Sequence, residues 1–404
     1  MHHRWGACGC LVAALLALSG CSSSGGSEVG LTASNQSAPR STTRATEPPA
    51  GPGSAKGLPT SPVTEPPTTS PPAPLPGAGN PEGNAEVPAE ARAVDTSRPD
   101  RVIGDGTPAS CTSAAVVEAV AAGGIITFDC GPDPVTITME ATAKVRNDSG
   151  PEIVLDGGGK VTLSGGGRRR ILYMNTCDEA QVFTTSHCQD QDHPRLTVQD
   201  LTFVDGNATG ETAEGGGGGA ILVRGGRVKI IGSRFLRNRC DPTGPDVGGA
   251  AVRVLSQSQG LPVYVVSSTF GGAPGQGGSC SNGGALSSIG VSWQVLNSVI
   301  SHNEATGTGA NPARGGTPGG GSGAGIYADG NLFTVRVAGT RIEENHANEG
   351  GGAVFFVSND RTGSLTIEGS TLHRNRSDGF ETEGFPGIFF LGAGSPAVSS
   401  STLE

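Results

Sequence analysis

The sequence predicts an all-β domain in which short strands stack coil upon coil, with one short helix near its start. A frame of alternating apolar residues recurs about every 30 residues, which is typical of stacked β repeats. A turn of small residues follows each frame, and glycine makes up 67 of the 404 residues. The frames are anchored on Phe203, Phe235, Phe270, Ile300, Ile342, Leu372 and, in a weaker copy, Leu403.

The clearest frame reads VKIIGSRFLRN over residues 228–238. Val228 and Ile230 alternate with polar residues, as in a strand with one buried face. Gly232 then breaks the alternation before Phe235, so the frame predicts two short strands that meet at a corner. In every copy the corner residue is of a type that tolerates unusual backbone angles: Asp200, Gly232, Ser267, Asn297, Gly339, Gly369 and Ser400.

A second element lies between the anchors. It is a small-residue turn that leads into a further short strand, so one coil holds about three strands. Stacked coils place like residues above like at about 4.8 Å, with backbone hydrogen bonds between coils. The turns occupy residues 218–221, 248–252, 283–286, 323–326 and 351–354, with a shorter version at 386–388.

These motifs resemble the right-handed parallel β-helix of the pectate-lyase-like superfamily over about residues 150–404. The alternation of GGAI with F-x-x-N, as at residues 235–238, resembles the repeats of polymorphic outer membrane proteins. The resemblance implies a parallel β-helix (solenoid) and, in its enzymatic members, action on polysaccharides. The chain lacks the Asp-Asp pair and the Gly-His-Gly of polygalacturonase-like members. We therefore assign no catalytic residue.

The N-terminal part has the composition of an exported, tethered protein. Residues 1–20 read as a signal peptide, and the segment that ends in Cys21 resembles the lipobox of bacterial lipoproteins, in which the cysteine carries lipid. An ordinary signal peptide is the alternative. Residues 21–100 are rich in Pro, Ser, Thr and Gly and are expected to be a disordered linker before a domain at 101–404. No later segment has the ~20 apolar residues of a membrane span.

Six cysteines follow the leader, and an even number in an exported chain favours disulfides. Fifteen pairings are open. We expect the neighbours to pair: Cys111 with Cys130, Cys177 with Cys188, and Cys240 with Cys280. Metal binding is the alternative, but no C-x-x-C or Cys/His cluster supports it. A helix pattern at about residues 112–122, which Thr112 or Ser113 can cap, is expected to cover the first coil.

The loop at residues 175–195 is the least repetitive part of the domain and is our candidate binding loop. Asp190, Asp192, His193 and Arg195 crowd its end. Carboxylates beside a cation suit proton abstraction or glycoside cleavage, and they can also hold Ca²⁺. A polar surface loop is the plain alternative. Apart from Ca²⁺, no metal or cofactor is expected.

The net charge of −10 disfavours binding to nucleic acid and to anionic lipid surfaces. We expect a monomer on the bacterial cell envelope, held to the membrane only by its N-terminal lipid, with the domain facing outward. The predicted function is non-catalytic: a rigid face for a glycan or a surface partner, adhesin-like or structural. The alternative is a polysaccharide lyase or a glycoside hydrolase.

Overall fold

The computed structural model describes residues 75–212 and 215–404. The chain divides into two compact units, Met1–Ser70 and Pro71–Glu404, and everything below concerns the second. The expected signal peptide, Cys21 and most of the expected linker lie outside the described residues.

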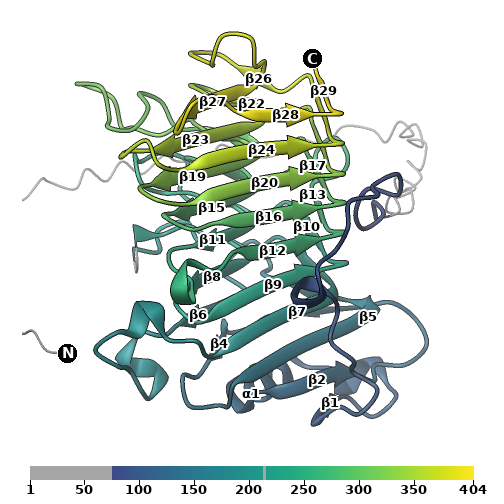
Figure 1. Cartoon of the computed structure of the whole chain (residues 1–404). Helices are drawn as coiled ribbons and strands as arrows, with labels where there is room; N and C mark the ends of the chain where they lie inside the picture. Colours follow the sequence, from purple (N-terminus) through teal and green to yellow (C-terminus); the bar gives the residue numbers. More distant parts are fainter. Residues whose placement is uncertain (1–74, 213–214) are drawn as a thin grey trace, which may run out of the picture. The chain divides into compact units, whose positions relative to one another are not determined.

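The described unit is mostly β, with parallel strands stacked in three sheets (Figure 1). The 17-stranded sheet contains β1 (Arg101–Ile103), β2 (Gly124–Phe128), β3 (Val135–Thr138), β5 (Glu152–Ser164), β7 (Arg195–Val204), β9 (Arg227–Ile231), β10 (Arg234–Leu236), β12 (Val263–Val266), β13 (Thr269–Phe270), β16 (Trp293–Leu296), β17 (Val299–Ser301), β20 (Thr334–Ala338), β21 (Arg341–Glu343), β24 (Ser364–Glu368), β25 (Thr371–His373), β28 (Ala397–Ser399) and β29 (Thr402–Leu403).

The other two sheets follow chain order, so each strand pairs with its equivalent in the next coil. The eight-stranded sheet contains β4 (Ala143–Val145), β6 (Leu172–Asn175), β8 (Ile221–Arg224), β11 (Val252–Val254), β15 (Leu286–Ile289), β19 (Ile326–Gly330), β23 (Val354–Ser358) and β27 (Ile388–Leu391). The four-stranded sheet contains β14 (Ser279–Cys280), β18 (Glu304–Ala305), β22 (His346–Ala347) and β26 (Arg376–Ser377).

The predicted anchors form one vertical column. Parallel register joins Phe203 to Phe235 and then to Phe270, and it continues through Ile300, Ile342, Leu372 and Leu403. The three phenylalanine rings stack with centroid separations of 5.0 and 4.7 Å. The anchors from Phe203 to Leu372 are buried in the core, which confirms the repeating frame.

The corner prediction is also confirmed. All seven corner residues have positive φ, between 46° and 58°. In this left-handed region a side chain crowds the backbone, which explains why glycine, asparagine, aspartate and serine occupy it. Six of the corners turn the chain from one strand of the large sheet into the next, for example from β9 into β10, whereas Asp200 lies within β7.

The helix α1 (Ser113–Ala122) begins where the sequence predicts it. The Thr112 side chain accepts a hydrogen bond from the backbone N–H of Ala115 and so caps its first turn. Val116 and Val120 are buried in the core of the first coils. None of the helices in the described part of the chain is long and apolar enough to cross a membrane. Short 3-10 turns occur at η1 (Ala89–Ala91), η2 (Pro108–Ser110), η3 (Glu179–Gln181), η4 (Cys188–Asp190) and η6 (Ser258–Gly260).

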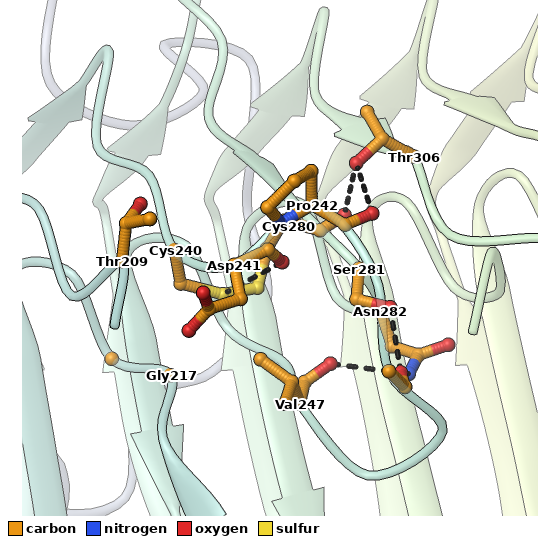
Figure 2. The surroundings of a disulfide bond; sticks show 12 residues. Thr209, Gly217, Cys240, Asp241, Pro242, Val247, Cys280, Ser281, Asn282 and Thr306 are labelled. Atoms are coloured by element: carbon orange, nitrogen blue, oxygen red, sulfur yellow. Dashed lines mark hydrogen bonds between the residues drawn. A yellow bond between two sulfur atoms is a disulfide. The ribbon is translucent and has the colours of Figure 1, made fainter. Parts of the chain in front are cut away.

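The three expected disulfides are present: Cys111–Cys130, Cys177–Cys188 and Cys240–Cys280. The first lies beside α1. The third joins neighbouring coils next to the start of the four-stranded sheet (Figure 2), where both sulfurs are buried with Ala208 and Ala250.

Residues 75–100, here called the strap, depart from the disordered linker expected up to residue 100. The strap crosses the strands of the large sheet before it reaches β1 (Figure 1). Asn297 binds both backbone groups of Ala85, at 2.8 and 2.9 Å, and Gln199 binds both of Val94, at 2.9 and 3.1 Å. The composition predicts disorder because the strap has too few apolar residues for a core of its own; the sheet supplies the missing partners.

Candidate functional site

A column of hydrogen-bonding side chains runs along the outer face of the large sheet, and it is called here the polar column. Its members occupy one register position in successive coils: Thr197, Lys229, Tyr264, Gln294, Arg336 and Thr366. Their neighbours Val198, Ile230 and Val265 are buried in the core. Because side chains alternate across a strand, the polar column faces away from the core.

The strap forms one wall beside the polar column. The next outward column of the same strands is apolar, and it packs against strap residues Ala85, Val87 and Ala91. This apolar column consists of Ile231, Val266, Leu296 and Ala338. The strap therefore covers the apolar column, and the polar column runs along the edge of the strap.

A cavity of about 170 Å³ lies where the strap meets β7, β9 and β12. Its carboxylates already have donors from the protein. Arg195 donates to Glu152 at 3.1 Å, and the Tyr264 hydroxyl donates to Glu90 of the strap at 3.1 Å. Backbone and Tyr264 hydrogen bonds lower the pKa of Glu90, while burial and then Glu90 raise the pKa of Tyr264. Glu90 therefore stays ionised and Tyr264 stays protonated at neutral pH.

Two cations of the cavity, Lys229 and Arg227, form no close ion pair among the described residues. Lys229 donates to two strap carbonyls, Arg92 O at 2.8 Å and Glu90 O at 3.3 Å, and its partial burial lowers its pKa. Arg227 lies 3.7 Å from Asp192, too far for a short charge-assisted bond. The cavity thus has donor capacity left for oxygen atoms of a ligand.

The candidate loop contributes one of its four predicted residues to this cavity. Arg195 lines it and forms ion pairs with Glu152 and Asp192. Asp190 instead accepts a hydrogen bond from the backbone N–H of Gln259, and His193 lines a separate hollow beside Pro151. The structure therefore brings Asp192 and Arg195 together but separates them from the other two.

The sequence analysis did not identify the polar column, although the spacing of its residues is visible in the sequence. Each member is the sixth residue before an anchor: Lys229 precedes Phe235, and Tyr264 precedes Phe270. No spacing in the sequence indicates Glu90 of the strap, because its position depends on contacts with strands about 140 residues later in the chain. No group of three or more His, Cys, Asp or Glu placed to hold a metal occurs among the described residues.

The asparagines of the F-x-x-N motif have structural partners. Asn345 accepts hydrogen bonds from the backbone and the side chain of Asn303, both at 2.9 Å. Its own amide donates to Asn375 at 2.8 Å. The three side chains are buried, so this ladder joins coils and is not a binding surface.

Comparison with known proteins gave no match: no protein-family model, no curated protein and no solved structure matches the chain.

Proposed function

We propose that this protein is a lipid-anchored surface module whose right-handed parallel β-helix binds an extended glycan without cleaving it. The resemblance to pectate-lyase-like proteins and to polymorphic outer membrane protein repeats supports the β-helix, and the stacked parallel strands agree with it. Export, the Cys21 lipid, an outward-facing domain on the bacterial envelope and a monomeric state are parts of the same proposal.

The polar column is the observation that carries this proposal. It offers one hydrogen-bonding side chain per coil at a spacing of about 4.8 Å, a length comparable to one sugar unit of an extended glycan. Lys229 and Arg336 supply donors, and Gln294 supplies both a donor and an acceptor. Sugar hydroxyls need such a mixture, and the strap wall beside the column limits the direction in which a chain can lie.

A polysaccharide lyase is the second candidate, because of one specific observation. Lys229, whose pKa is lowered by burial, lies in the same cavity as Arg227 and Tyr264. A lowered lysine pKa is a feature of general bases, and the tyrosine hydroxyl can donate a proton. In a lyase, the base would remove a carbon-bound proton, the glycosidic C–O bond would break, and the departing oxygen would receive a proton.

Glycan binding tests the first candidate. The full chain in detergent is applied to a panel of neutral and uronic-acid glycans, together with Lys229→Met, Arg336→Met and the control Lys160→Met, which changes a lysine at the other end of β5. We expect Lys229→Met and Arg336→Met each to bind the glycan about tenfold more weakly than the wild type, a loss of ~1.4 kcal/mol. Lys160→Met should bind it with the affinity of the wild type.

The proposal fails if none of the glycans binds, or if Lys229→Met and Arg336→Met bind as tightly as the control. The same samples, incubated with and without Ca²⁺, are examined for unsaturated sugar products. Release of such products by the wild-type protein, abolished by Lys229→Met, would favour the lyase instead.

A further inference from the structure

Arg253 is a buried cation on the outer face of the eight-stranded sheet, away from the polar column. In the register of that sheet it lies between Leu222 of β8 and Ser287 of β15. Only 3% of the residue is exposed. Its Nε and Nη1 atoms are buried and have no hydrogen-bond partner in the described part of the chain.

Among residues 75–212 and 215–404, no carboxylate forms a hydrogen bond with Nε or Nη1 of Arg253. The acid that acts on it electrostatically is Asp246, whose side chain is bound by the Asn311 amide at 3.0 Å. Burial lowers the pKa of Arg253 to about 10, so it remains protonated at neutral pH. A buried cation without a hydrogen-bonded partner is strongly unfavourable, and nearly every buried donor in a folded protein is paired.

A second buried guanidinium lies close to the first. Arg170 is 4% exposed and donates to the carbonyls of Gly217 and Gly218, at 2.9 and 3.0 Å. Its carboxylate neighbour is Glu211 at 3.8 Å, whose side chain is half exposed. Arg170 and Arg253 repel each other electrostatically, so a net positive charge is buried in a chain of net charge −10.

The cover over the two arginines is glycine backbone. Residues 215–219 are all glycine, and the first four have positive φ. A Cβ at Gly217 would lie 3.1 Å from Nη1 of Arg253 and 2.0 Å from Gly248 O, so this turn packs directly on the guanidinium. With no side chains, the glycine turn can change its backbone angles at low steric cost.

We infer that Arg253, with Arg170 beside it, binds a small oxyanion beneath the glycine turn. An oxyanion would supply the acceptors that Nε and Nη1 of Arg253 lack and would offset the paired positive charges. Guanidinium groups bind carboxylates and phosphates with directed, charge-assisted hydrogen bonds. The ligand class is therefore a phosphate or a carboxylate, free or carried on a small molecule. This site is independent of the glycan groove, which lies on a different sheet.

The test measures thermal unfolding and titration calorimetry of the full chain in detergent, with inorganic phosphate, acetate and chloride at equal ionic strength. Arg253→Met replaces the guanidinium by an apolar side chain of similar length. Arg341→Met is the matched control, since Arg341 is paired with Glu343 on β21 of the large sheet. Non-specific salt effects on stability act on all three proteins alike.

We expect phosphate or acetate to bind the wild type and Arg341→Met saturably and to raise their Tm above the value in chloride. The same anions should bind Arg253→Met at least tenfold more weakly. Binding by phosphate alone would point to a tetrahedral ligand and binding by acetate alone to a carboxylate. In chloride, Arg253→Met should unfold at or above the wild-type Tm, because it removes an unpaired buried charge. Equal responses of all three proteins to the anions would overturn the inference. It would also be overturned if the wild type bound no anion and Arg253→Met had the lower Tm, because buried water would then satisfy the guanidinium.

Discussion

At the scale of single residues, the corner of each coil restricts the residue type most strongly. Seven positions need positive φ, and Asp200 is the only one of the seven that carries a charge. Although the Asp200 residue is exposed, desolvation of its carboxylate by the surrounding protein raises its pKa, the nearby Asp156 adds to this, and Arg234 opposes it. The equivalent corner three coils later is Asn297, so an amide fits the same geometry.

Asp200→Asn should therefore stabilise the fold at neutral pH. The folded-state pKa of Asp200 lies above its unfolded value, so the wild type loses stability as pH rises through the folded pKa. The variant should melt about 1–3 °C higher at pH 7, and the difference should shrink towards zero near pH 3, where the carboxyl is protonated in both states. Melting curves at the two pH values measure this.

Asp205→Asn is the matched control. Asp205 also has positive φ, but it forms an ion pair with Arg237 at 2.9 Å. Its replacement should leave the Tm at pH 7 unchanged or lower. A higher Tm for both variants, or a gain for Asp200→Asn that is as large at pH 3 as at pH 7, would show that desolvation of the carboxylate is not the cause.

At the scale of elements, the strap depends on a few side chains of the sheet. Asn297 and Gln199 each bind the N–H and the C=O of one strap residue, much as a neighbouring strand would. Thr269 adds two more bonds, to Gly77 and Gly79. Because these contacts recognise backbone, a Pro- and Gly-rich segment can lie in a fixed position without a large apolar core of its own.

Asn297→Ala should loosen the strap near Ala85. The change removes two hydrogen bonds, each worth roughly 0.5–1.5 kcal/mol, so local opening should become about 5- to 100-fold more frequent. Hydrogen exchange at the Ala85 amide and limited proteolysis within residues 75–100 measure this opening. Ser267→Ala, which likewise places alanine at a positive-φ corner of the same sheet, is the control.

Protection of Ala85 that is unchanged by Asn297→Ala would show that apolar packing alone holds the strap. A loss of protection in both variants would mean that the sheet itself is disturbed. The same experiment bears on the groove, because Glu90 and the Lys229 contacts belong to the strap.

At the scale of the whole molecule, the proposed lipid decides where the protein is found. Cys21→Ala should move the protein from the membrane fraction to the medium, since a hydrocarbon anchor is the proposed attachment. Fractionation of cells that export the wild type and the variant measures this. Cys240→Ala is the control for loss of a cysteine as such. Retention of Cys21→Ala in the membrane would contradict the lipid anchor.

The sequence alone determined the repeating part of this protein: the anchors, the corners, the turns, the capped helix and the disulfide pairs. The physical reason is that stacked coils place each residue above its equivalent, so spacing along the chain becomes contact in space. For example, Phe235 meets Phe203 and Phe270 because all three hold the same position in the frame.

The tertiary structure alone decided the strap, the groove and the Arg253 site. Ala85 and Asn297 are 212 residues apart, and Val94 and Gln199 are 105 apart; no period links these pairs. The sequence does not show which groups pair with the backbone donors and acceptors of the strap. The strap becomes ordered only when the folded sheet presents side chains to these backbone groups. Arg195 likewise lines the groove and pairs with Asp192. Asp190 and His193 of the same loop do neither, because the loop's path through space separates residues that are close in the chain.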